Sequence, residues 1–187
     1  TNASYEETLD AIKAGASKAT HIFNAMRRFH HRDPGPAIAL LQSPSGYLEV
    51  IADFIHLHPS VVKLVVDYVV PSRVVLVTDS IAAAGMPDGV YELGELKVRV
   101  VDGVAKLYDS DVLAGSTLTM DKAFKNILSL GDDLVDVVIM ASETPARSIG
   151  LKRVGDIKEG FKADLVVLDD SFNVKQVYVN GVLSYEK

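Results

Sequence analysis

The chain has 187 residues, of which 48% are hydrophobic and 24% are charged, and this composition excludes a disordered protein. The length suffices for one sizeable domain but falls short of the roughly 250 residues of a complete (β/α)₈ barrel. A net charge of −6 argues against nucleic-acid binding, and the absence of cysteine excludes disulfides and thiolate chemistry. The absence of cysteine fits a cytoplasmic protein, and because no apolar run reaches the roughly 18 residues of a membrane span, we expect no membrane partner.

Helical and extended patterns alternate through the first 150 residues. A capping box from Ser4 to Glu7 predicts a helix that ends at Gly15. The other elements expected in this part are strands at 18–23, 47–52 and 73–77 and helices at 37–42 and 59–70. The valine-rich run at 73–77 is typical of a strand buried on both faces. This alternation predicts an α/β fold with βα units around a parallel sheet, either open or part of a barrel.

The later part of the sequence adds β structure at two places. Alternation around Asp102-Gly103 predicts a β-hairpin at 90–108, and the chain becomes β-rich again from Gly155, with a turn at Asn180-Gly181. The remaining expected elements are a strand at 112–114, a helix that opens at 115–117 and helical segments near 133–141 and 143–149. We therefore divide the chain into residues 1–150 and a small β element at 151–187.

Polar side chains follow three successive predicted strands, at the carboxyl ends where ligands collect in α/β folds. His21 lies near the end of the first strand, Asp53 and His56 follow the second, and Asp79 follows the third. A carboxylate such as Asp79 can act as a general base on water, and a neutral imidazole can bind a divalent metal. The alternatives are a helix cap for Asp79 and a hydrogen-bonded structural role for His21. Because one edge of a sheet gathers all four side chains, we favour a functional site.

Two further segments are candidates for substrate contacts. Residues 27–32, RRFHHR, form the dense basic patch of an acidic chain, and an arginine such as Arg32 can hold a phosphate or carboxylate through bidentate hydrogen bonds. Asn24, just before the patch, offers both a donor and an acceptor. The stretch from Leu113 to Ser116 leads toward a helix whose free N–H groups can bind an oxygen-rich ligand. A solvated loop and ordinary helix capping are the respective alternatives.

Several motifs taken together resemble one family. They are THIFNAM at 20–26, IADFIH at 51–56, LVTDS at 76–80, LAGSTLTM at 113–120 and GDIKEGFKADLVVLD at 155–169. In this order they are similar to the N-acetylglucosamine-6-phosphate deacetylases of the amidohydrolase superfamily. The resemblance implies the C-terminal part of a (β/α)₈ TIM-type barrel and part of a small β-sandwich. It also implies metal-dependent hydrolysis of an N-acetyl group on an amino-sugar phosphate.

The resemblance implies a role for each matching residue. His21 corresponds to a metal ligand, and Asp79 to the catalytic carboxylate that activates the metal-bound water and protonates the leaving amine. His56 corresponds to a substrate-contacting histidine that can polarise the acetyl carbonyl. The other substrate-binding positions are Asn24, Ala25, Arg32, Asp53, Leu113, Ala114 and Gly115. A divalent metal, zinc or iron, and a homodimeric full-length protein are also implied.

The sequence departs from the family pattern in two residues and in one larger respect. Phe54 and Ile55 follow Asp53 where the family usually has Asp-Gly, and Ser80 stands where alanine is commoner. The early metal-binding region of the superfamily is missing, so we expect an excerpt that is inactive when expressed alone. The alternatives are another amidohydrolase, dihydroorotase-like or adenine-deaminase-like, and a sugar-phosphate-binding module without catalysis.

Overall fold

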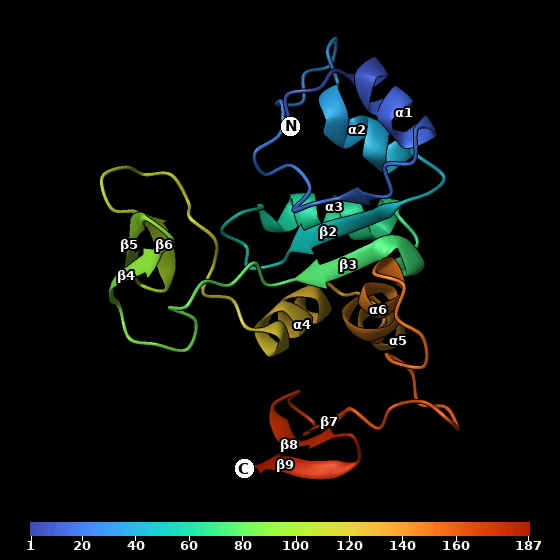
Figure 1. Cartoon of the computed structure of the whole chain (residues 1–187), viewed down its shortest axis with the longest axis vertical. Helices are drawn as coiled ribbons and strands as arrows, with labels where there is room; N and C mark the ends of the chain where they lie inside the picture. The colour runs from blue at the N-terminus through green and yellow to red at the C-terminus, as the bar shows by residue number, and fades with distance from the viewer.

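A three-stranded parallel sheet in the order β1-β2-β3 lies at the centre of the computed structural model, which describes residues 1–187 (Figure 1). The strands are β1 (Lys18–Ala19), β2 (Tyr47–Ile51) and β3 (Val74–Val77). Val74, Val75 and Leu76 are buried, as expected from the valine-rich run. The predicted α/β alternation is therefore confirmed.

Helices surround this sheet. They are α1 (Tyr5–Lys13), α2 (Gly35–Gln42), α3 (Pro59–Tyr68), the one-turn η1 (Pro71–Arg73), α4 (Met120–Ser129), α5 (Leu134–Val138), the π-helix η2 (Ile139–Glu143) and α6 (Thr144–Ser148). Figure 1 shows α1 and α2 on one side of the strands and α4, α5 and α6 on the other. The capping box is confirmed, because Ser4 accepts from the Glu7 N–H and Glu7 accepts from the Ser4 N–H. None of the helices combines the length and the apolar character needed to cross a bilayer.

Two hydrophobic cores hold these elements together. The main core has 21 buried residues, among them Leu48 and Ile51 of β2, Val65 of α3 and Ile127 of α4. A separate core of six residues lies under a second sheet and includes Val98 and Ala114. The first core fixes the strand ends that carry the predicted site.

The segment expected to be a single hairpin is a three-stranded antiparallel sheet. Its strands are β4 (Gly89–Leu93), β5 (Leu96–Val101) and β6 (Val104–Leu107). The turn at Asp102-Gly103 is confirmed, and a second two-residue turn at Gly94-Glu95 joins β4 to β5. The strand that was not predicted, β4, has no fully buried side chain, so its periodicity is weak.

Three predicted boundaries are wrong. The first strand stops at Ala19 because His21 and Phe23 adopt positive φ angles, which end the extended backbone. Residues 112–114 form no strand and make a single bridge between Leu113 and Lys106. Helix α4 begins at Met120 rather than at 115–117, because Gly115 is left-handed, with a φ of 62°, and the N-cap residue Thr119 is still extended.

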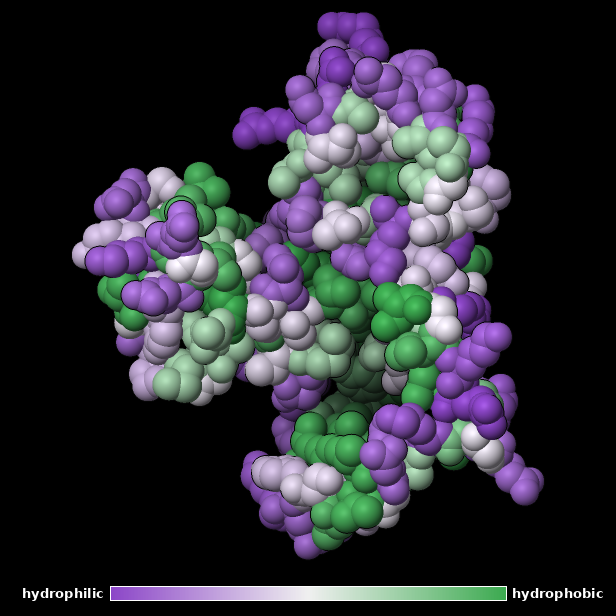
Figure 2. Space-filling view, viewed as in Figure 1, coloured by the Kyte–Doolittle hydropathy of each residue, from purple (hydrophilic) through white to green (hydrophobic).

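The β-rich end of the chain forms an antiparallel sheet of β7 (Leu165–Leu168), β8 (Val174–Val179) and β9 (Val182–Glu186). Figure 2 shows hydrophobic side chains gathered over this sheet, and Val166 and Val182 are exposed. The sheet contributes no buried residue to the main core, and Leu168 and Phe172 pack against that core. These two side chains therefore attach the terminal sheet to the rest of the molecule. The division of the chain at residue 150 stays a prediction.

The segment around Gly115 is fastened to the end of β3. The Asp79 carbonyl accepts from the Ser116 N–H at 2.8 Å, and the Ser116 carbonyl accepts from the Ile81 N–H at 2.9 Å. A Cβ on Gly115 would lie 2.6 Å from Ile81 Cγ2 and 3.0 Å from the Asp79 carbonyl oxygen. Glycine is therefore required here both by its positive φ and by the close approach of the two backbones.

We predict that Gly115→Ala destabilises the protein more than Gly131→Ala. Both glycines have positive φ, but a Cβ on Gly131 meets nothing within 4 Å. Backbone strain is thus common to the two variants, and overpacking adds about 1–3 kcal/mol at Gly115 alone. Urea unfolding measures the difference, and equal losses would show that the contact with Ile81 is unimportant.

Candidate functional site

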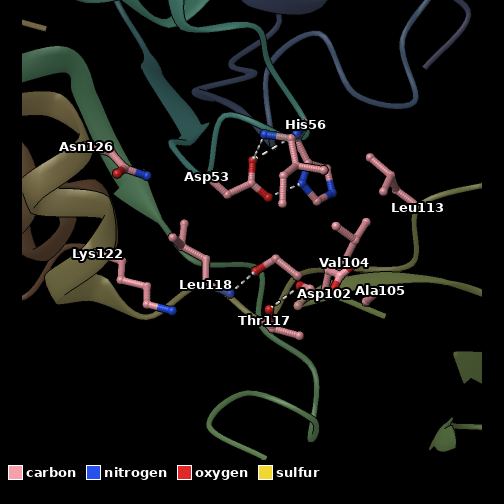
Figure 3. Close-up of a pocket in the computed structure, with 14 residues that line it drawn as sticks. Asp53, His56, Asp102, Val104, Ala105, Leu113, Thr117, Leu118, Lys122 and Asn126 are labelled. Atoms are coloured by element: carbon pink, nitrogen blue, oxygen red, sulfur yellow. Dashed lines mark hydrogen bonds and ion pairs between the residues drawn. The ribbon is translucent and has the colours of Figure 1, made fainter. Parts of the chain in front are cut away.

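A hollow of about 390 Å³ lies beyond the carboxyl end of β2 (Figure 3). The loop after β2, the β5–β6 turn, the segment before α4 and the first turns of α4 enclose it. Residues that line it include Asp53, His56, Gly103, Leu113, Gly115 and Asn126. The structure thus brings together Asp53, His56, Leu113 and Gly115, four of the predicted site residues.

Asp53 and His56 form a hydrogen-bonded pair in this hollow. The His56 Nδ1 atom lies 2.6 Å from Asp53 Oδ2, and the two side chains are only 7% and 6% exposed. An ionised carboxylate can only accept, so the proton of this hydrogen bond resides on Nδ1. In the neutral ring, Nε2 is then an acceptor available to a ligand.

The backbone after β2 holds the Asp53 side chain from the other side. Asp53 Oδ1 accepts from the N–H groups of Ile55 and His56, each at 2.8 Å. This local turn is the arrangement that aspartate adopts readily at the start of a loop. Asp53, predicted among the substrate-binding residues, therefore has both carboxylate oxygens engaged by its own loop.

Hydrogen bonding keeps the Asp53 carboxylate ionised. Burial raises the pKa of Asp53, but the hydrogen bonds from the His56 ring and from the His56 and Ile55 N–H groups lower it more. The pKa of Asp53 consequently lies below its ordinary value of 3.8. The carboxylate is ionised at neutral pH and fixes both the tautomer and the orientation of His56.

Left-handed backbone geometry is concentrated around the predicted site. Five of the nine non-glycine residues with positive φ follow the three parallel strands: His21, Phe23, Ala25, Phe54 and Asp79. Such conformations cost about 1–3 kcal/mol each and persist where surrounding structure enforces them. Their position at the strand ends agrees with a functional role for this edge of the sheet.

His21 is suited to be one metal ligand. Its Nδ1 lies 3.1 Å from the Asn24 carbonyl oxygen, and when it donates there Nε2 is left to bind a metal. The chain contains no cluster of three or more histidine, aspartate or glutamate side chains that could hold a metal ion. The residues present therefore fit one position of a metal site and do not form a complete one.

Asp79 lies at the edge of the hollow rather than in its lining. Its backbone carbonyl binds the Ser116 N–H, and its exposed side chain makes no ion pair or hydrogen bond within the chain. The left-handed φ of 51° sets this residue apart from the extended strand before it. A carboxylate free of partners in the chain is available to a substrate or to water.

The remaining predicted residues lie outside the hollow. Asn24 donates from its side chain to the Ile22 carbonyl, Ala25 is exposed, and Arg32 Nη1 lies 2.8 Å from His31 Nε2 in the basic loop. Ala114 is buried in the small core beside Val98. The loop after β1 is thus a separate surface from the hollow.

Sequence reasoning missed Asn126 and Lys122 of α4, and it gave no site role to the turn at Asp102-Gly103 or to the start of β6, all of which line the hollow. Asn126 matters most among these residues, because its side-chain amide donates to the Ala52 carbonyl, just before Asp53, at 2.7 Å. The available signal was a polar residue one position before the buried Ile127, beside the apolar stripe of an amphipathic helix.

The profile of the amidohydrolase family matches residues 1–183, so the chain belongs to the amidohydrolase family. Within that family it is similar to deacetylases of amino-sugar phosphates, as the motifs indicated. It is 40% identical over 187 residues to N-acetylglucosamine-6-phosphate deacetylase of Vibrio furnissii. This alignment covers 99% of this chain and 46% of the relative. It is also 40% identical over 184 residues to N-acetylgalactosamine-6-phosphate deacetylase of Escherichia coli O157:H7, covering 97% and 48%.

A solved structure extends the likeness to three dimensions. The structure is a variant of N-acetyl-D-glucosamine-6-phosphate deacetylase from Mycobacterium smegmatis in complex with N-acetyl-D-glucosamine-6-phosphate. It superposes with a TM-score of 0.94 at 41% identity, over 98% of this chain and 49% of that chain. The chain spans about half the length of the curated relatives it matches.

We predict that Asp53→Asn removes part of the acid sensitivity of folding. Because the pKa of Asp53 is lowered on folding, its stabilising contribution is present above the ordinary value of 3.8 and is lost as the pH falls through the lower folded value. The parent chain should therefore lose stability more steeply below about pH 4 than the variant. At neutral pH the variant should be less stable by about 1–3 kcal/mol.

Urea unfolding between pH 2 and 7 measures both effects. The other carboxylates of the chain are common to the two proteins, so their titration cancels in the difference. Parallel stability profiles would contradict the assignment of a lowered pKa to Asp53.

Proposed function

We propose that these residues belong to a metal-dependent enzyme that hydrolyses the N-acetyl group of N-acetylglucosamine 6-phosphate to glucosamine 6-phosphate and acetate. The observation that carries the proposal is the TM-score of 0.94, over 98% of the chain, with a deacetylase solved in complex with that sugar phosphate. The pair of Asp53 and His56 in the hollow supports it, because an oriented imidazole suits acyl chemistry.

In this proposal each strand end has one task in the reaction. His56, when protonated, donates from Nε2 to the acetyl carbonyl oxygen while Asp53 holds Nδ1. Asp79 takes a proton from the attacking water and gives it to the amine nitrogen as the C–N bond breaks, so acetate and the free amine leave. A divalent metal, zinc or iron, supplies an acidified water when bound, and His21 would hold it through Nε2.

The substrate phosphate and the larger architecture complete the proposal. Asn24, Ala25 and Arg32 contact the phosphate, and Leu113, Ala114 and Gly115 line the sugar pocket. The strands β1–β3 belong to a (β/α)₈ barrel and β7–β9 to a small β-sandwich. Metal ligands beyond His21 come from the part of the longer relatives that this chain does not span. The homodimer and the cytoplasmic location stay predictions.

N-acetylgalactosamine 6-phosphate, an epimer of N-acetylglucosamine 6-phosphate, is a second candidate substrate. The relative from Escherichia coli named N-acetylgalactosamine-6-phosphate deacetylase has the same 40% identity as the glucosamine enzyme of Vibrio furnissii. Comparing kcat/KM for the two phosphorylated sugars assigns the preference, since the two substrates differ only in the orientation of one hydroxyl group.

We predict that Asp79→Asn lowers acetate release from N-acetylglucosamine 6-phosphate by about 10²-fold or more, because proton transfer contributes factors of this size. The assay uses the protein as its gene encodes it, with metal content measured alongside. Asp10→Asn is the matched control, because Asp10 is an exposed carboxylate of α1 that pairs with Lys13 and does not line the hollow.

Unchanged metal content with lost turnover is the expected result for Asp79→Asn. Loss of the metal would make Asp79 chiefly a ligand, and full turnover would remove it from the reaction. Absence of acetate release by the parent protein on either sugar would overturn the proposed function.

A further inference from the structure

Asn126 holds the peptide group that joins β2 to Asp53. The ladder between β2 and β3 ends at Ile51 and Val77, so the Ala52 carbonyl lies beyond it. Ala52 is fully buried, and its carbonyl oxygen accepts from Asn126 Nδ2 at 2.7 Å. A buried carbonyl without a partner costs about 1–3 kcal/mol, so this hydrogen bond satisfies a real requirement.

The same hydrogen bond fixes the direction of the Asp53 side chain. The Ala52 carbonyl and the Asp53 nitrogen belong to one planar peptide group, so holding the oxygen also holds the plane from which Asp53 departs. Asp53 in turn holds His56 through Nδ1 and through the His56 N–H. Figure 3 shows Asn126 and the pair of Asp53 and His56 on the same side of the hollow.

Helix α4 is itself anchored on its other side, so Asn126 is attached to a fixed support. Lys125 Nζ donates to Asn173 Oδ1 at 2.6 Å, and the rings of Phe124 and Phe172 meet edge to face at 6.1 Å. The Asp169 carboxylate accepts from the N–H and the side-chain amide of Asn173. The loop between β7 and β8 therefore anchors α4, and α4 in turn fixes the end of β2 through Asn126.

We propose that Asn126 is a positioning residue for His56, acting through the Ala52–Asp53 peptide group. The consequence for catalysis rests on the proposed function, whereas the effect on His56 is a property of the fold alone. An asparagine that only filled a polar gap would affect stability and leave the ring of His56 unchanged.

Asn126→Asp is the sharpest variant, because it keeps the size of the side chain and, in its ionised form, has no donor for the Ala52 carbonyl. Asn126→Ala removes the side chain altogether. Ser129→Ala is the matched control. It removes another side-chain hydrogen bond of α4, from an exposed hydroxyl to the Asn126 carbonyl, and it leaves the hydrogen bond from the Asn126 side chain to the Ala52 carbonyl in place.

The first measurement is imidazole ¹⁵N NMR of His56 in the 187-residue chain, with unfolding followed in parallel. We expect the Nδ1-protonated form in the parent and in Ser129→Ala, and a mixture of the two tautomers in Asn126→Asp. If Asn126→Ala does not fold, the His56 tautomer in Asn126→Asp alone tests the proposal. A folded Asn126→Asp chain with an unchanged His56 tautomer would overturn the proposal.

The second measurement is acetate release by the protein as its gene encodes it. We expect kcat to fall about tenfold with KM changed less than threefold, because a misaligned group weakens the transition state more than the ground state. A loss confined to KM would also overturn the proposal. If the parent releases no acetate, the proposed function fails while the NMR result still tests the positioning of His56.

Discussion

Backbone groups beyond the ends of three parallel strands have no partner in a ladder, and the rest of the structure is arranged to supply one. The Asn126 amide donates to the Ala52 carbonyl after β2, and the Ser116 hydroxyl donates to the Thr78 carbonyl after β3. Asp53 accepts from the N–H groups of its own loop. Each of these side chains comes from, or fixes, a segment that encloses the hollow. The site is thus built by the same hydrogen bonds that end the strands.

Pattern and spacing were enough to locate this edge of the sheet. Placing His21, Asp53, His56 and Asp79 after successive strands required only the alternation of apolar runs and helical segments. The pairing of Asp53 with His56 was not predicted, because a three-residue spacing in a loop leaves the backbone path open. The short first strand was missed for a similar reason, since no glycine marks the left-handed turns of His21 and Phe23.

Long-range partners explain the other gaps in prediction. Asn126 stands beside the apolar stripe of α4 and matters because of a carbonyl 74 residues earlier. The segment before α4 was expected to cap a helix, but its hydroxyl groups bind carbonyls of distant loops: Ser116 binds Thr78, and Thr117 binds Gly103. Ser80, at a position where alanine is commoner in the family, donates to the Leu118 carbonyl and so adds a further link. Local propensity carries no information about such contacts.

The links that enclose the hollow join residues 38 and 74 positions apart in the sequence. Closing loops of this length costs entropy before any contact offsets it, so such contacts form after the local helices and turns. The hollow should accordingly be completed late in folding and opened early in partial unfolding. A chain that retains its secondary structure can therefore lose the alignment of His56 before any global melting is visible.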